Sequence, residues 1–192
     1  MENKILQENK KTNTLINFFI NNKKLIGLLI VGLLTVLIFF FIYNKIQVDK
    51  NIKISEEYNN SVILINKGKN EDAKIFLLKI INYKNKFYSP LSLNLLIENN
   101  FEENTDKLKN LYDICISIPG LDKEYKNLLK YKKTLILMKE GEEIKILSEL
   151  KEIINSDSVW KNSALNLIKN YYLSRGEKNK YKEFQKLLEK NK

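Results

Sequence analysis

The sequence predicts an all-α protein in which a single transmembrane helix precedes a domain of about four helix pairs. Two observations support this fold class. The stretch Leu25–Tyr43 contains nineteen residues and no charged side chain. Beyond Tyr43, apolar residues recur at steps of three and four, and helix-pair signals return at a nearly constant spacing. Residues 1–24 then form a short N-terminal tail, and residues 44–192 form the helical domain.

Leu25–Tyr43 has the length and composition of a transmembrane helix. At a rise of about 1.5 Å per residue, the stretch extends about 28 Å, close to the thickness of the hydrocarbon core. Thr35 is its only polar residue before the closing tyrosine. Hydrogen bonds within such a helix satisfy its backbone, so that lipid meets no unpaired polar group. We therefore expect Leu25 and Tyr43 to mark the ends of the span and the lipid bilayer to surround it.

Three other interpretations compete with a retained span. A cleaved signal peptide needs a short apolar core and a small-residue cleavage site, whereas 24 residues precede this stretch and YNKIQVDK follows it. A buried core helix is rarely apolar on all sides. An interfacial helix needs a polar face, which this stretch lacks. The sequence favours the transmembrane helix.

Lysines flank the span on both sides, with a slight excess before it. The positive-inside rule therefore favours a cytoplasmic N-terminus and an exported C-terminal domain. The residues that enter this comparison are Lys10, Lys11, Lys23 and Lys24 before the span, and Lys45, Lys50 and Lys53 after it.

Composition excludes several classes of catalytic and metal site. The chain contains no histidine and one cysteine, Cys115. This rules out Cys-His catalysis, thiolate or imidazole zinc clusters and a disulfide within the chain. Carboxylates, lysines and hydroxyls remain, but none stands in a recognisable catalytic motif. We expect a non-enzymatic protein with no metal, cofactor or small-molecule substrate, and a carboxylate-based hydrolase stays as the enzymatic alternative.

The net charge of +10 comes almost entirely from lysine, because Arg175 is the only arginine among 33 basic residues. Phosphate-binding surfaces usually employ the bidentate guanidinium group of arginine. Lysines also alternate with glutamates, as in Lys151-Glu152, which is typical of solvated helix surfaces. We therefore expect no nucleic-acid partner. A lysine-based nucleic-acid binder at the membrane surface and attraction to anionic headgroups remain alternatives.

Periodicity and turn residues predict eight helices after the span. Gly68, Gly141 and Gly176 each end one helical pattern and are followed by polar residues that open another. Ser89-Pro90 has the residues of a helix start, and Pro119-Gly120 marks a break. The predicted helices lie near residues 47–66, 70–83, 90–98, 104–117, 122–139, 142–155, 158–174 and 178–190.

The second helix of each pair carries a triplet of residues at i, i+4 and i+7. The starts of these triplets are separated by 35, 38 and 35 residues. The triplets are Ala73/Leu77/Ile80, Leu108/Tyr112/Cys115, Ile146/Leu150/Ile153 and Tyr181/Gln185/Leu188. Such a period is typical of stacked helix pairs, in which each pair buries its apolar face against its neighbours.

This pattern resembles a degenerate tetratricopeptide repeat. GKNEDA at 68–73 matches the turn between the two helices of that repeat and the small residue that follows it. Tyr172, four residues before Gly176, matches the aromatic residue expected late in the first helix. The resemblance implies a right-handed solenoid of about four helix pairs, with the polar last helix as its cap. An irregular helical bundle is the alternative.

The run KEYKNLLKYKK at 123–133 mixes aromatic and basic residues as a peptide groove would. It supplies three groove candidates, Tyr125, Tyr131 and Lys132, and Tyr172 completes the set. Lysines that extend along half-buried tyrosines explain the run equally well. Cys115 and the stripe Trp160, Ala164, Leu167, Ile168 and Tyr171 are interpreted as core.

Taken whole, the chain resembles the ancillary subunit family of the bacterial Sec translocon (SecYEG), single-span proteins with an exported tetratricopeptide-like domain. The matching stretches are LINFFINNKKLIGLLIVGLL at the anchor, YNNSVILINKGKNEDAKIFLLKI at 58–80, and SVWKNSALNLIKNYYLSRGEKNKYKEF at 158–184. The last contains the Trp-x-x-Ser-Ala helix of that family, here at residues 160–164.

The resemblance implies a single-pass protein of the bacterial inner membrane, with its N-terminus in the cytoplasm and residues 44–192 in the periplasm. It also implies protein partners, namely the translocon, periplasmic chaperones or exported clients, and it supplies no catalytic residue. The expected function is a chaperone-like accessory to protein export. A scaffold of the same kind for envelope assembly or cell division is the alternative.

Overall fold

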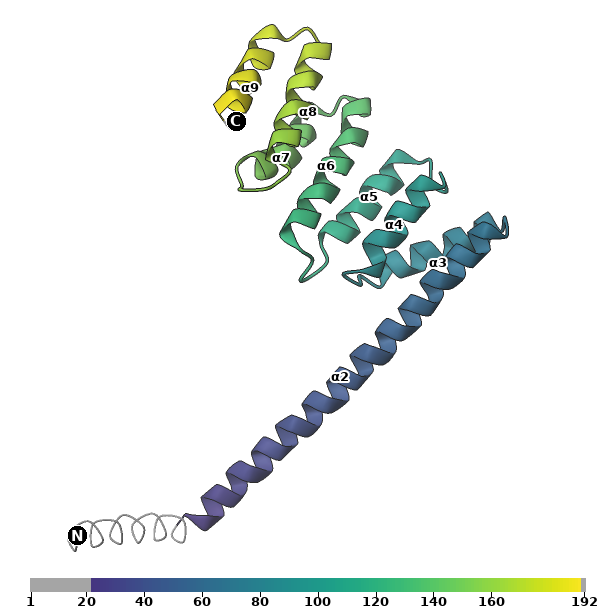
Figure 1. Cartoon of the computed structure of the whole chain (residues 1–192), viewed down its shortest axis with the longest axis vertical. Coiled ribbons are helices and arrows are strands. Elements are labelled where there is room, and N and C mark those ends of the chain that lie inside the picture. The colour runs from purple at the N-terminus through teal and green to yellow at the C-terminus, as the bar shows by residue number, and fades with distance from the viewer. Residues whose placement is uncertain (1–21, 191–192) are drawn as a thin grey trace, which may run out of the picture. The chain divides into compact units, whose positions relative to one another are not determined.

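A computed structural model describes residues 22–190, and this part of the chain is entirely helical, as predicted (Figure 1). The chain divides into two units, one ending at Ile52 and one beginning at Lys53. Most of the predicted N-terminal tail lies outside the described residues. The helices are α2 (Lys23–Asn66), α3 (Asn70–Asn82), α4 (Tyr88–Glu98), α5 (Thr105–Ile116), α6 (Lys123–Glu140), α7 (Glu143–Ile154), α8 (Lys161–Ser174) and α9 (Lys178–Lys190).

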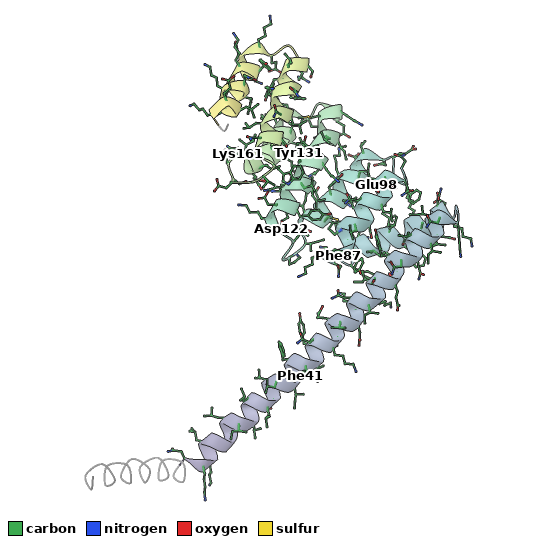
Figure 2. The ribbon with its side chains drawn as sticks, in the orientation of Figure 1. Phe41, Phe87, Glu98, Asp122, Tyr131 and Lys161 are labelled. Atoms are coloured by element: carbon green, nitrogen blue, oxygen red, sulfur yellow. The ribbon has the colours of Figure 1, made fainter. Side chains whose placement is uncertain are left out.

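The first unit contains the apolar segment of α2, which is long and apolar enough to cross a membrane, with a mean hydropathy of 3.1. The segment is exposed rather than packed: Leu28 is 73% exposed and Phe41 70% exposed (Figure 2). This exposure disagrees with a buried core helix. The Thr35 hydroxyl donates to the Val31 carbonyl at 2.8 Å, so its polar group is satisfied within the helix.

The helix α2 does not end at Tyr43, the predicted end of the span. Leu25 and Tyr43 are both interior to it, since it begins at Lys23 and runs without a break to Asn66. The separate helix predicted to begin near residue 47 is therefore the continuation of α2. The physical reason is local: residues 44–53, NKIQVDKNIK, contain neither glycine nor proline and offer nothing that ends a helix.

From α3 onward, the predicted helix bounds agree with the structure to within three residues at each end. The start of α4 is capped by a different residue from the predicted Ser89. The Asn85 side chain, not Ser89, accepts the first free backbone N–H groups, from Phe87 at 3.0 Å and Tyr88 at 2.9 Å. Ser89 is buried and donates to the Ile80 carbonyl at 2.7 Å, which ties α4 to α3.

The turns inside the four helix pairs share one hydrogen-bond pattern. After α2, the residue in the left-handed conformation is Gly68, and the next N–H, that of Lys69, donates to the Leu64 carbonyl at 2.9 Å. Gly141 and Gly176 adopt the same left-handed conformation after α6 and α8, and the residue after each donates the equivalent hydrogen bond. After α4 the position is occupied by Asn100, with φ of 53°. This is the Schellman motif, in which glycine or asparagine ends a helix without strain.

The second unit holds two apolar clusters, one built around α3 to α6 and the other around α6 to α9. Leu129 belongs to the first and Leu137 to the second, so α6 contributes to both. The predicted triplets Ala73/Leu77/Ile80 and Ile146/Leu150/Ile153 are completely buried, and Cys115 is buried as well. Their interpretation as core is confirmed, and burial raises the pKa of the Cys115 thiol to about 12.

Between the two clusters lies a buried lysine, Lys133 on α6. Its ammonium group donates to Asp113 of α5 at 2.6 Å and to Glu149 of α7 at 2.7 Å. Burial lowers the pKa of Lys133, but the two carboxylates outweigh it and raise the pKa above its ordinary value. Lysine and carboxylate side chains therefore do more at this position than cover a solvated helix surface, because Lys133 joins three helices.

Candidate protein-binding face

Side-chain contacts join the first helices of the pairs into a row, which we call the even-helix face: α2 from Lys53 on, α4, α6 and α8. The Tyr88 hydroxyl of α4 donates to Ser55 of α2 at 2.8 Å. The rings of Tyr88 and Tyr58 lie 5.6 Å apart. Both tyrosines are half-buried, so each presents part of its ring to the surroundings. Aromatic side chains of this kind supply large contact area at protein interfaces.

The structure brings together two of the predicted groove residues, Tyr125 and Lys132. Asn94 of α4 lies between them, because it donates to the Tyr125 hydroxyl at 3.5 Å and accepts from the Lys132 ammonium at 3.0 Å. Tyr125 and Lys132 are seven residues apart and therefore share one side of α6. Burial raises the pKa of Tyr125, so its hydroxyl stays protonated at neutral pH.

Tyr131 lies elsewhere on α6. Its ring is 5.9 Å from the ring of Trp160, and both pack against the second apolar cluster. The next link between α6 and α8 is polar. Glu124 accepts from the Ser158 hydroxyl at 2.6 Å and from the Val159 backbone N–H at 3.0 Å. The even-helix face thus continues from α6 onto the start of α8.

Tyr172, the fourth predicted groove residue, lies in the core. It is only 1% exposed, and its ring stacks on Phe184 of α9 at 5.7 Å. Its hydroxyl donates to Glu143 at 3.0 Å. Burial, reinforced by that carboxylate, raises the pKa of Tyr172 to about 12. The repeat pattern identified Tyr172 in the sequence as an aromatic residue late in a first helix. Only the packing of α8 against α9 shows that its ring faces the core.

A hollow of about 540 Å³ opens beside the first turns of α4 and α6, and we call it the Phe87 hollow. Leu121 lies 9% exposed in its lining, whereas Phe87 is 62% exposed at its edge. Two separate segments contribute: residues 86–91, which lead into α4 and form its first turn, and residues 120–125, which run from the α5–α6 loop into the first turn of α6. Figure 2 labels Phe87 and Asp122. The lining residues are Lys86, Phe87, Leu91, Gly120, Leu121, Asp122 and Tyr125.

Of these residues, sequence reasoning identified only Tyr125. The others carry no signal in the sequence, because their common property is spatial: they come from segments about thirty residues apart in the chain. Phe87, an aromatic residue three positions before the helix predicted at 90–98, was the one available clue.

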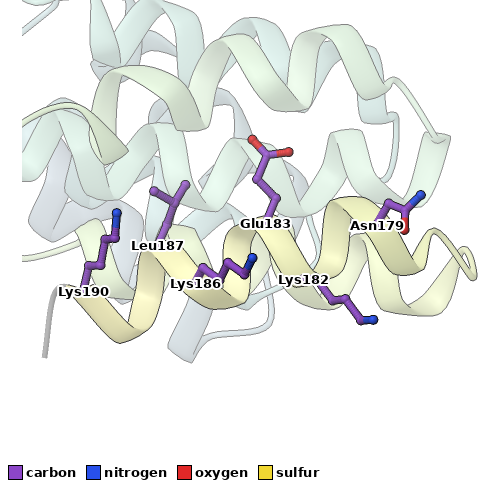
Figure 3. A pocket seen from close by; sticks show the side chains of 6 residues that line it. All are labelled: Asn179, Lys182, Glu183, Lys186, Leu187 and Lys190. Carbon is purple, nitrogen blue, oxygen red and sulfur yellow. The ribbon is translucent and has the colours of Figure 1, made fainter.

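A second hollow, of about 490 Å³, has a different character. All of its lining residues come from α9, and Figure 3 shows Lys182, Lys186 and Lys190 following one another along that helix. Because no other helix contributes a wall, it is an open shelf rather than a cleft.

The part of the chain from residue 22 to 190 contains no group of three or more histidine, cysteine, aspartate or glutamate side chains placed to hold a metal ion. What the even-helix face offers chemically is half-buried aromatic surface, amide and hydroxyl hydrogen-bonding groups, and lysine charge. Comparisons with protein-family models, curated proteins and solved structures found no match to this chain.

Proposed function

We propose that this chain is a non-enzymatic, membrane-anchored scaffold that binds other proteins through a tetratricopeptide-like solenoid. The observation that carries the proposal is the exposed apolar segment of α2. Apolar side chains such as Leu28 and Phe41 are more than two-thirds exposed along it. Such a surface is unfavourable in water, and a lipid bilayer is the surroundings that its length and composition fit.

The solenoid is supported by repetition. All four turns within the pairs have the Schellman pattern, and the helices from α3 to α9 pack mainly against helices that are next to them, or one apart, in the chain. In a solenoid each unit touches only its neighbours, and a continuous core results from stacking. The polar last helix α9, of which Leu188 is the one buried residue, then serves as the cap.

Protein binding is supported by the even-helix face. In helical solenoids, the row of equivalent helices forms an extended surface for partners. Here that row carries Tyr58, Tyr88, Tyr125 and Trp160, all of them half-buried. These residues can bury further area against a partner without a large loss of side-chain freedom. A chain with no histidine and one buried cysteine offers little for catalysis.

As the narrower form of the proposal, the scaffold serves the Sec export machinery at the bacterial inner membrane, with a cytoplasmic N-terminus and a periplasmic domain. The support is the resemblance of residues 58–80 and 158–184 to the ancillary translocon subunit family, together with the excess of lysine before the span. The bound partners are then the translocon, periplasmic chaperones or exported clients.

Purification of the full chain from membranes in mild detergent tests this function. Translocon subunits are expected to be enriched about tenfold or more over an unrelated single-span protein at equal expression. The matched control keeps residues 44–192 and replaces residues 25–43 with an unrelated apolar span. If the tagged chain recovers no translocon subunit while a known subunit does so in parallel, the narrower proposal fails.

A reporter fused after Lys192 tests the orientation. Activity is expected from a reporter that works only outside the cytoplasm, and not from one that works only inside it. The reverse pattern would contradict the proposed topology.

A further inference from the structure

We propose that the Phe87 hollow holds a large apolar side chain of a bound polypeptide whose neighbouring residues are acidic. The inference rests on the proposed protein-binding function and adds to it the place of binding and the chemistry of the bound segment. It follows from the size of the hollow, its lining and the net charge of the two segments, residues 84–87 and 122–126, that reach it.

The hollow has the size and position of a binding site. Its volume of about 540 Å³ falls within the roughly 300–1,000 Å³ typical of sites that enclose a small ligand. It therefore has room for one large side chain and the adjoining backbone. It also lies where α4 and α6 adjoin, so a polypeptide seated there continues along the even-helix face towards Asn94 and Lys132.

The lining is apolar where an inserted side chain would rest. Leu121 is nearly buried, and Leu91 and Tyr125 are half-buried, so each keeps some surface that an occupant would cover. Phe87 lies edge-to-face against Tyr88, with ring centroids 5.0 Å apart, and still remains 62% exposed. An exposed aromatic ring beside an apolar hollow is the arrangement found around hydrophobic anchors at interfaces.

The two segments that reach the hollow together carry a net positive charge, and Lys86 is the lysine that lines the hollow itself. Residues 84–87 carry Lys84 and Lys86, and residues 122–126 carry Lys123 and Lys126. None of these four lysines forms an ion pair with a carboxylate among residues 22–190.

The two carboxylates of the same segments are already engaged by the protein. Asp122 accepts from the Tyr125 N–H at 3.0 Å and caps α6, and Glu124 accepts from Ser158 and Val159. These donors are neutral, so both carboxylates keep their charge, and the two segments together hold four lysines against two carboxylates. The remaining positive charge complements a segment with aspartate or glutamate beside its apolar anchor, and it disfavours one with lysine there.

The test uses the full chain in detergent micelles and a fluorescein-labelled peptide of sequence Asp-Glu-Phe-Leu-Glu-Asp, followed by fluorescence anisotropy. We expect saturable binding, weakened about tenfold or more when Phe-Leu is replaced by Ala-Ala or when the four acids are replaced by lysine. Absence of saturable binding up to about 1 mM peptide, or equal binding of the acidic and basic peptides, overturns the proposal.

Variants of exposed residues locate the site without disturbing the core. Phe87→Ser and Lys86→Glu are each expected to weaken binding of the acidic peptide about tenfold. Lys86→Glu should also improve binding of the lysine-flanked peptide. Matched controls are Ile144→Ser, at a residue 85% exposed on α7, and Lys151→Glu, at an exposed lysine of the same helix. If the controls lose as much affinity as the hollow variants, or the hollow variants lose none, the binding site lies elsewhere.

Recovery of the translocon, measured on the same variants, separates the two proposals. If the chain recovers the translocon but binds the acidic and basic peptides equally, the proposed peptide site is wrong and the proposed function stands. If the chain prefers the acidic peptide but recovers no translocon subunit, the proposed link to export is wrong and the hollow remains a peptide-binding site.

Discussion

Leu150 on α7 provides a quantitative test of the proposed stacked core. The residue is 0% exposed and lies in the second apolar cluster between Ile146 and Ile153. Leu150→Ala removes the free energy of burial and leaves a cavity, which together lower the free energy of unfolding by about 2–5 kcal/mol. A domain of this size loses roughly 2–4 °C of Tm per kcal/mol, so the expected decrease is roughly 4–20 °C.

Leu150→Asp is expected to have a larger effect. The new carboxylate would occupy a site with no solvent and no partner, which is far less favourable than a cavity. Because most domains are stable by only about 5–15 kcal/mol, we expect this variant to lose the folded second cluster at neutral pH.

The assay is urea unfolding of the full chain in detergent, followed by the fluorescence of Trp160. Trp160 is the only tryptophan of the chain and packs on the second cluster, so its emission reports on the region around Leu150. Far-ultraviolet circular dichroism follows the helices of both clusters together.

Ile144→Ala is the matched control, since Ile144 lies on the same helix and is 85% exposed. We expect its free energy of unfolding to stay within about 0.5 kcal/mol of that of the parent chain. An unchanged unfolding curve for Leu150→Ala, or a larger effect of Ile144→Ala, would refute the assignment of this face of α7 to the core.

Three further predictions concern the polar contacts and the turns. Lys133→Ala removes the partner of the half-buried Glu149 and of the exposed Asp113, so urea unfolding should show a loss of about 1–3 kcal/mol, against almost none for the exposed Lys151→Ala. Gly141→Ala places a side chain at φ of 75° and should lower the free energy of unfolding by about 1–2 kcal/mol. A Tm equal to that of the parent chain would contradict the Schellman turn. For Glu143, hydrogen bonds from Lys180 and Tyr172 hold the pKa below its ordinary value. Its stabilising contribution is thus present above the unfolded-state pKa, about 4.3, and is lost as the pH falls through the lower folded-state pKa. As the pH falls from about 5 to about 3, the free energy of unfolding of Glu143→Gln, measured by urea titration, should therefore decrease less than that of the parent chain. Equal decreases in the two proteins would contradict this assignment.

Local signals explain why most of the helices were predictable. Apolar spacing fixed the inward face of α3 and α7, and Gly68, Gly141 and Gly176 marked helix ends because few other residues adopt the left-handed conformation they occupy. Where that signal was absent, the sequence was less informative: Asn100 takes the same role after α4, where the sequence has no glycine.

The candidate site was predictable only in part. Tyr125 and Lys132 lie on one side of α6 by helical periodicity, but Asn94 joins them from another helix. The Phe87 hollow depends on the packing of the α5–α6 loop beside the start of α4. No pattern within one helix contains that information.

By itself, the sequence determined the membrane-length apolar segment, the helix pairs and the buried triplets, because each depends on residues within a few turns of one another. Only the tertiary structure decided that Tyr172 lies in the core and that Lys133 joins three helices between two apolar clusters. It also decided that a largely apolar hollow, lined by Lys86 among others, opens beside Phe87. The physical reason is that burial, ion pairing and cavity shape depend on which segments meet in space, and distant segments meet only when the helices pack.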